Sequence, residues 1–348
     1  MKGRYFYLDV LRVIAIVSVV LMHSSSVVQK YYGLELNAFP FQFTNIFNTI
    51  TRFAVPLFIM ISGCLMINRG TEYKKTLAKV RHYIVLYCIW SLIYSVILIE
   101  LKYYKTYSLI GLIVNTISDT LIGHFHFWYL FLICGMYLIL PFIEILANNM
   151  TEIDKKIFVI LNVFLCFVLP TILLNEKINE ILGQHMKHLN VGFLGGYVLY
   201  FMLGYWLKEY TVKNKKILYI LMIVSVLYTV IVTNVPSAIM EREVTGLREN
   251  LTPNILILTI SIFLIVKEKI KDKCSNIIMQ NIITKLSELS FGVYLVHMLV
   301  IELLSDWCLS VTSNCITALI MEFFITLCIS FSISYVLYDN QITRFVVK

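Results

Sequence analysis

The sequence has few charged residues and no segment with the composition of a soluble domain. Asp, Glu, Lys and Arg together make up 14% of its 348 residues, whereas a typical soluble domain has about 25%. Hydrophobic residues make up 59% of the chain, and its mean hydropathy is +0.80. This composition excludes a water-soluble globular protein and predicts a chain embedded in a lipid bilayer.

The sequence also lacks regularly spaced cysteines, long linkers, low-complexity tracts and an obvious internal repeat. We therefore predict one membrane domain that covers residues 1–348. A disulfide framework is not expected, because most of the eight cysteines lie in apolar runs, where a cysteine packs as a small apolar residue. These cysteines are Cys64, Cys88, Cys134, Cys166 and Cys328.

Apolar runs of about 16 to 24 residues recur along the chain, and a transmembrane helix needs about 20 residues. They predict an all-α integral membrane protein with about ten transmembrane helices. The longest hydrophilic outer loops are expected near residues 103–125, 175–190 and 235–250. The spans fall near residues 8–28, 44–67, 82–100, 127–146, 157–174, 191–207, 217–233, 251–266, 289–308 and 315–338.

Lysine and arginine are distributed unevenly between the loops, and membrane proteins retain these residues on the cytoplasmic side. With both termini cytoplasmic, the inner segments carry 20 of the 29 basic residues and the outer loops carry 7, while Arg12 and Arg52 lie inside spans. The net charge of +8 is thus a topology signal, and we expect no nucleic-acid partner. Because Arg12 interrupts the first apolar run, and no small-residue cleavage pattern ends that run, we expect the first span to be retained.

The first span contains an arginine and a histidine eleven residues apart, in the segment R-V-I-A-I-V-S-V-V-L-M-H. An arginine at the bilayer centre costs about 2.5–3.5 kcal/mol, so its retention points to a function. Eleven residues make three helical turns plus about 20°, which places Arg12 and His23 on one helix face about 16 Å apart. Asp9 is expected to pair with Arg12. The alternative is structural, with a neutral Asp9–Arg12 pair and a hydrogen-bonded packing histidine.

Polar residues also occur in later spans. In the second span, Pro56 follows Arg52 and removes a backbone hydrogen bond, and a bend beside an arginine predicts a pocket. The fourth span begins with H-F-W-Y at residues 126–129, for which an aromatic belt at the membrane surface is the alternative explanation. The ninth span places His297 one helical turn after Tyr294.

Four of these segments resemble the integral-membrane acyltransferase-3 family of acyl-CoA-dependent transferases. Arg12 and His23 match its R-x10-H signature, and residues 52–63 are similar to its R-x-x-x-P-x-F-x-x-x-S-G segment. Residues 126–129 resemble its H-x-W-[FY] element, and residues 290–297 resemble its S-x-G-x-Y-x-x-H element. The four segments lie in order on the expected spans, and the resemblance covers essentially the full length.

The resemblance implies transfer of an acyl group, most often acetyl from acetyl-CoA, to a hydroxyl or amine of a cell-surface or lipid-linked glycan. His23 would be the catalytic general base, a task suited to a histidine with an unperturbed pKa of about 6.5. Arg12 would bind the acyl donor, and Arg52 would hold the donor or stabilise the thioester oxyanion. Acetyl-CoA is implied as a donor substrate, with no permanently bound cofactor. The expected supporting pocket consists of Asp9, Ser62, Gly63, His126, Trp128, Tyr294 and His297.

The predicted orientation places Arg12 toward the cytoplasm and His23 toward the outside. Because acyl-CoA is cytoplasmic, we expect its nucleotide near Arg12 and the basic loop at residues 69–81, with the thioester reaching toward His23 and the acceptor entering from outside. Some relatives append an extracellular transferase or racemase domain. None is recognisable in this sequence, so we expect acceptor specificity from the membrane domain and its outer loops.

Two other interpretations compete with this one. His185 and His188 have a spacing that suits metal ligands on a helix, but no third ligand is evident. The pair His124 and His126 also lacks an evident third ligand, so no metal is expected. A transporter or a ligand-sensing membrane domain also uses buried Arg, Asp and His, although no paired broken helices or internal symmetry support a transporter. The sequence is rich in Lys, Ile and Asn, which favours a bacterial cytoplasmic membrane as the location.

Overall fold

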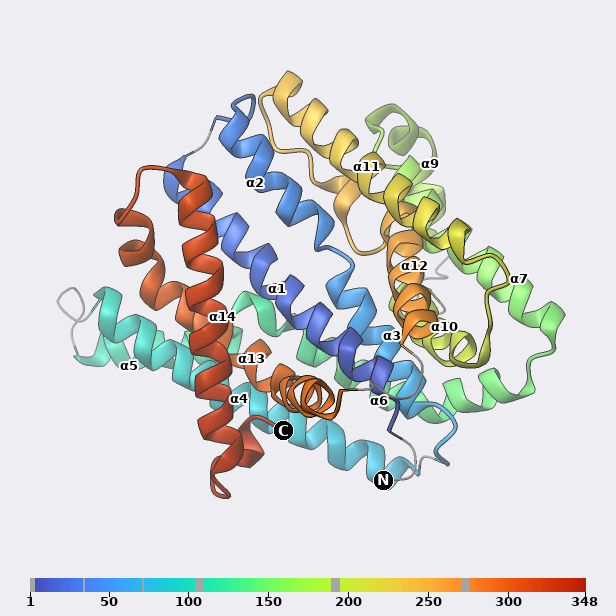
Figure 1. The fold of residues 1–348 in the computed structure, drawn as a ribbon, viewed down its shortest axis with the longest axis horizontal. Helices are drawn as coiled ribbons and strands as arrows, with labels where there is room; N and C mark the ends of the chain where they lie inside the picture. The colour runs from blue at the N-terminus through green and yellow to red at the C-terminus, as the bar shows by residue number, and fades with distance from the viewer. Residues whose placement is uncertain (1–3, 34, 71, 104–108, 189–194, 271–275) are drawn as a thin grey trace.

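The computed structural model describes residues 4–33, 35–70, 72–103, 109–188, 195–270 and 276–348, which are helical with connecting turns and contain no strand (Figure 1). This architecture confirms the all-α prediction. The α-helices are α1 (Phe6–Tyr32), α2 (Phe39–Ile50), α3 (Ala54–Met66), α4 (Tyr73–Tyr103), α5 (Leu109–Ile122), α6 (Trp128–Asn149), α7 (Glu152–Val163), α8 (Leu169–Ile172), α9 (Glu176–His188), α10 (Tyr197–Glu209), α11 (Lys215–Met240), α12 (Pro253–Lys269), α13 (Ile277–Ser310) and α14 (Cys315–Asp339).

Among the described residues, nine helical segments are long and apolar enough to cross a membrane. Each of the ten predicted spans overlaps at least one α-helix. The sixth span, predicted at residues 191–207, overlaps α10, and its first four residues lie outside the described residues. The protein is therefore a multi-pass membrane protein.

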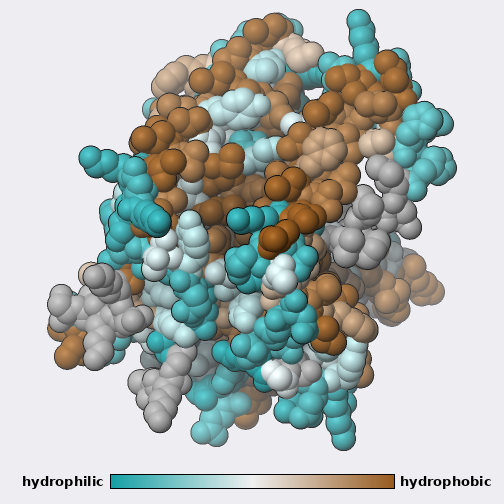
Figure 2. All heavy atoms as spheres, turned by 90° about the vertical axis from the view of Figure 1, so that its right-hand side faces the viewer, coloured by the Kyte–Doolittle hydropathy of each residue, from teal (hydrophilic) through white to brown (hydrophobic). Residues whose placement is uncertain are grey.

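Many large apolar side chains remain exposed on the outer faces of the bundle, as expected for residues that contact lipid. Figure 2 shows hydrophobic side chains spread widely over one face, with hydrophilic side chains gathered toward its lower end. Examples with more than half of their surface exposed are Ile110 and Leu121 on α5, Ile160 on α7 and Ile231 on α11.

The beginning of α1, the beginning of α13 and the end of α14 lie on the same side of the bundle. Arg4 donates a hydrogen bond to Glu288 of α13 at 2.8 Å. The ammonium of Lys285 lies over the ring of Tyr338, near the end of α14, at 4.6 Å from the ring centroid. We call the ends on this side the inner ends, because the distribution of basic residues predicts that they face the cytoplasm.

Helix α1 lies at the centre of the bundle and packs against α2, α3, α12, α13 and α14 (Figure 1). Its core positions are apolar, and Leu11, Ala15, Ile16 and Val20 have no exposed surface. A central helix with a polar stripe places that stripe inside the protein rather than in lipid. This position accounts for how the chain tolerates Arg12 and His23 in its first span.

The second predicted span is two helices rather than one bent helix. Helix α2 ends at Ile50, α3 begins at Ala54, and Arg52 lies in the turn between them. Pro56 lies in the first turn of α3, where a backbone N–H makes no hydrogen bond within the helix, so its absence in proline costs no helical hydrogen bond. The break therefore occurs four residues before the proline, and it carries Arg52 into the interior.

Two of the outer segments expected as hydrophilic loops contain helices. Helix α5 occupies most of the segment at residues 103–125 and packs against α4, while α9 occupies most of the segment at residues 175–190. In the third, at residues 235–250, α11 continues to Met240 before the chain turns into a short 3-10 helix, η4 (Gly246–Arg248). The loop prediction was wrong for α5 because its sequence is largely apolar and its length of 14 residues is too short for a span of its own.

Candidate active site

A cavity of about 660 Å³ lies among α1, the α2–α3 turn, α3, α4, α6, α10, α13 and the segment after η4. Its lining includes residues near the inner ends of helices, among them Met66, Glu288 and Lys348, the last of which lies beyond α14. It also includes residues near the outer ends, among them Tyr197 and Asn250. The cavity therefore extends along the helices from their inner toward their outer ends.

Arg12 lines this cavity, but its expected pairing with Asp9 is weak. The closest Asp9 oxygen is 4.0 Å from the Arg12 guanidinium. Asp9 instead accepts hydrogen bonds from Arg4, at 2.7 Å and 3.1 Å, and from the Ser287 hydroxyl at 2.7 Å. These hydrogen bonds with Asp9 raise the pKa of Arg4, so Arg4 stays charged. Asp9 itself lies outside the cavity lining, whereas Arg12 is part of it.

His23 lines the same cavity and belongs to a cluster of four imidazole rings. The centroid of its ring is 5.2 Å from that of His297, and the His297 centroid is 5.3 Å from that of His126. The Nδ1 atoms of His126 and His124 are 2.7 Å apart. The cluster joins α1, α13 and the turn before α6, so three separate parts of the sequence position it.

The hydrogen bonds of His297 determine which of its ring nitrogens carries the proton. Its Nδ1 contacts two backbone carbonyl oxygens, that of Tyr294 at 2.8 Å and that of Val293 at 3.2 Å. Because a carbonyl only accepts, Nδ1 carries the hydrogen and Nε2 has a free lone pair in the neutral ring. His297 is fully buried, and its Nε2 has no hydrogen-bond partner among the described residues. A proton acceptor is thus buried beside the ring of His23.

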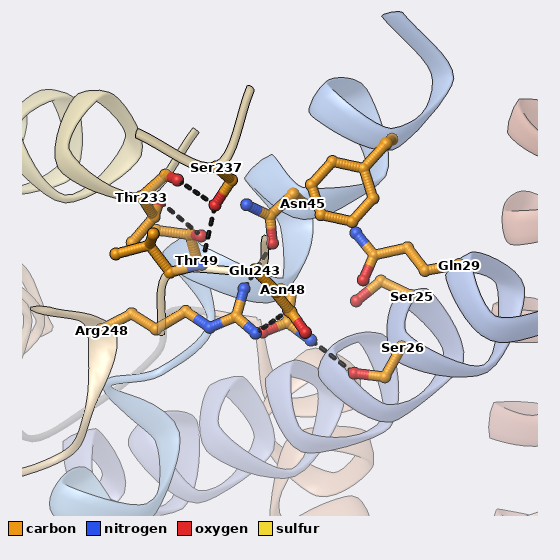
Figure 3. Close-up of polar contacts among 12 residues, drawn as sticks. Ser25, Ser26, Gln29, Asn45, Asn48, Thr49, Thr233, Ser237, Glu243 and Arg248 are labelled. Carbon is orange, nitrogen blue, oxygen red and sulfur yellow. Dashed lines mark hydrogen bonds and ion pairs between the residues drawn. The ribbon is translucent and has the colours of Figure 1, made fainter. Parts of the chain in front are cut away.

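Arg52 also lines the cavity, and an amide rather than a carboxylate holds its guanidinium. The Asn48 side-chain oxygen accepts from its Nε at 3.1 Å and from its Nη2 at 2.6 Å. The Asn48 amide nitrogen donates in turn to the Ser26 hydroxyl at 2.5 Å, and to the Met22 carbonyl at 3.3 Å (Figure 3). Asn48 therefore fixes Arg52 against α1 within one turn of His23. Asn48 was not among the residues predicted from the sequence, although its i, i+4 spacing from Arg52 was a usable signal.

The other expected pocket residues divide between the cavity and its surroundings. Ser62, His126, Trp128 and Tyr294 line the cavity, and the Tyr294 hydroxyl donates to the His126 carbonyl at 2.8 Å. Gly63 lies outside this lining. A Cβ atom on Gly63 would lie 1.8 Å from the backbone oxygen of Phe201, which shows that Gly63 allows α3 and α10 to pack closely.

No metal site accompanies the cavity in the described part of the chain, where no group of three His, Cys, Asp or Glu side chains has a metal-binding arrangement. His185 and His188 lie exposed on α9 and do not line the cavity. The side chains that line the cavity include imidazole, guanidinium, hydroxyl and carboxylate groups. This set suits proton transfer and the binding of anions.

The fold and the cavity define a multi-pass membrane protein with a polar interior site. A family model described as an acyltransferase domain, Acyl_transf_3, matches residues 5–339. No curated protein and no solved structure matches the chain. The chain belongs to the membrane acyltransferase-3 family and is an acyltransferase. The family match gives no support to a transporter or a ligand-sensing domain.

Proposed function

We propose that the protein transfers an acetyl group from acetyl-CoA to a hydroxyl of a cell-surface or lipid-linked glycan, in the cytoplasmic membrane of a bacterium. The observation that carries the proposal is that Arg12, His23 and Arg52 line one cavity, which is bounded by residues from both the inner and the outer ends of the helices. A donor from the cytoplasm and an acceptor from outside therefore have a common place to react.

His23 is the general base of the proposed reaction. It removes the proton of the acceptor hydroxyl while the hydroxyl oxygen attacks the thioester carbonyl carbon. The carbon–sulfur bond then breaks, and the CoA thiolate leaves with the proton that His23 had taken. The unpartnered Nε2 of His297 beside the His23 ring supports this role, because a neighbouring lone pair can accept an imidazole N–H and fix the ring that carries it.

The two arginines bind the donor and stabilise charge. Arg12 is nearer the inner end of α1 and suits the phosphates or the amides of CoA, which a guanidinium binds through several hydrogen bonds. Arg52 lies beside the part of α1 that carries His23, where a fixed cation stabilises the oxyanion that forms at the thioester carbonyl. The two roles predict different kinetic effects on substitution.

The test is transfer of radiolabelled acetyl from acetyl-CoA to glycans in membranes that contain each variant. His23→Ala should lower the rate by about 100-fold or more, as expected for removal of a general base. Arg12→Ala should mainly raise the KM for acetyl-CoA. The matched control is His185→Ala, because His185 is exposed and lies outside the cavity. Full transfer activity in His23→Ala would show that another group is the base.

A further inference from the structure

The outer end of the cavity contains aromatic and polar side chains that the roles above do not use. Trp128, at the start of α6, lines it with 42% of its surface exposed, and Tyr197, at the start of α10, lies beside it with ring centroids 5.9 Å apart. Glu249 and Asn250 line the same end and come from the segment between η4 and α12. All four residues belong to segments expected on the outer side of the membrane.

These four residues present donors and acceptors that have few partners within the protein. The Asn250 amide nitrogen donates to the Tyr197 hydroxyl oxygen at 3.0 Å, which leaves the Tyr197 O–H free to donate elsewhere. The Glu249 carboxylate makes no hydrogen bond or ion pair within the described ranges, although it is near enough to Arg52 for an electrostatic interaction. The outer end of the cavity thus combines aromatic rings with the carboxylate of Glu249, which has no hydrogen-bond partner within the described ranges, and the O–H donor of Tyr197.

A network of buried hydrogen bonds holds Glu249 and Asn250 in place. Arg248, the residue before Glu249, is 4% exposed and donates to both Asn45 of α2 and Glu243 (Figure 3). The Asn254 amide donates to the backbone oxygen of Leu247 at 2.8 Å, which fixes the other side of the turn. A short outer segment anchored by a buried arginine is a preorganised binding element rather than a free loop.

We propose that Trp128, Tyr197, Glu249 and Asn250 form the acceptor site, and that they bind a neutral sugar ring presented from outside. This inference rests on the proposed acyl transfer. One face of a sugar ring carries C–H groups, which pack against the electron-rich face of an aromatic ring. The hydroxyls of a sugar can donate hydrogen bonds to the Glu249 carboxylate and accept a hydrogen bond from the Tyr197 hydroxyl. A uronic acid or another anionic sugar is disfavoured, because its carboxylate would lie close to that of Glu249.

The position of this site matches the direction of the reaction. Glu249 interacts electrostatically with Arg52, and Arg52 is bound through Asn48 to the turn of α1 that contains His23. A sugar held at Glu249 therefore lies on the outer side of the two groups that are assigned to the acetyl transfer. The donor arm, which approaches from Arg12, reaches them from the other side.

The test is calorimetric titration of the purified full chain with maltotriose, chitotriose and trigalacturonic acid, without acetyl-CoA. Wild-type protein should bind at least one of the neutral trisaccharides more tightly than the anionic one. Trp128→Ala and Glu249→Ala should each weaken this binding by about tenfold, the effect of losing a central contact. Glu249→Gln should retain more of the neutral binding than Glu249→Ala and should bind trigalacturonic acid better than wild type does.

Matched controls are Trp307→Ala and Glu180→Gln, because both residues are exposed and lie outside the cavity. The proposal is overturned if wild type binds neither neutral trisaccharide, if it prefers the anionic one, or if the Trp128 and Glu249 variants bind as wild type does. The variant His23→Ala separates this proposal from the catalytic one. It should still bind the trisaccharide, and full acetyl transfer in that variant would refute the base without affecting the sugar site.

Discussion

At the scale of single residues, Arg52, which we propose to act in the reaction, is held by an uncharged partner. Asn48 accepts two hydrogen bonds from the guanidinium, and such bonds to a charged group contribute about 1.5–3 kcal/mol each. An asparagine holds the guanidinium without neutralising it, which a carboxylate would do. In the proposed reaction, this positive charge would stabilise the thioester oxyanion.

Replacing Asn48 should impair catalysis through Arg52. We expect Asn48→Ala to lower kcat/KM by about tenfold or more, because the guanidinium loses its fixed position. In a double-mutant cycle, Asn48→Ala should have little further effect in an Arg52→Ala background. The steady-state rate of acetyl transfer measures the effect of each single substitution and of the double substitution. Additive losses would mean that Asn48 acts on its own through its contacts with α1.

The sequence was enough to predict cavity residues where a charged or polar side chain interrupts an apolar run. It was not enough to predict the hydrogen-bond partners of these side chains. Arg12, His23 and Arg52 were chosen as polar residues within spans, and all three line the cavity. The pairing of Asp9 with Arg12 was expected from one-turn spacing, yet Arg4 lies closer to Asp9. Spacing within a helix does not include the contacts of a residue such as Arg4, which precedes α1.

At the scale of helices, hydropathy was enough to locate the spans, since burial in lipid requires a long apolar run in each helix. It did not locate the break between α2 and α3, because three turn residues within an apolar run hardly change the average. Nor did it indicate that η4 folds inward, which depends on Arg248 and on its partners in α2 and in the segment after α11. Features that rest on contacts between distant segments were therefore found only in the structure.

Helices α3 and α10 pack closely because each has a glycine at the contact. A Cβ atom on Gly204 would lie 1.9 Å from the backbone oxygen of Met60, so even alanine forces the helices apart. We expect Gly204→Ala to lower the apparent Tm of the purified protein. The free energy of unfolding should fall by about 2 kcal/mol or more, because the backbone of α3 or α10 must move.

The matched control for that substitution is Gly135→Ala on α6, where a Cβ atom would meet nothing within 4 Å. Alanine favours a helix over glycine by about 1 kcal/mol, so Gly135→Ala should leave the Tm unchanged or raise it. Thermal unfolding of the two variants in the same detergent provides the comparison. Equal Tm values for Gly204→Ala and Gly135→Ala would contradict the close packing of α3 and α10.

At the scale of the whole molecule, a central helix organises both the fold and the site. Because α1 is surrounded by other helices, its polar face lines an internal cavity and its apolar face forms part of the core. The polar side chains of α1, whose burial in lipid would be costly, are thereby kept out of contact with lipid. The same arrangement sets Arg12 and His23 at different depths of one cavity, which gives the proposed reaction its direction across the membrane.

This direction can be measured by labelling single cysteines at the two ends of the cavity. In a background where the exposed Cys88 and Cys328 are replaced by serine, together with Cys274, which lies outside the described residues, we expect Glu249→Cys to react with a membrane-impermeant maleimide added outside intact cells. Lys348→Cys should react only in inverted vesicles, and acetyl-CoA should slow its labelling because the donor occupies that end. Both predictions follow from the distribution of basic residues, which places Lys348 on the cytoplasmic side. Labelling of both positions from the same side would refute a cavity that receives its two substrates from opposite sides.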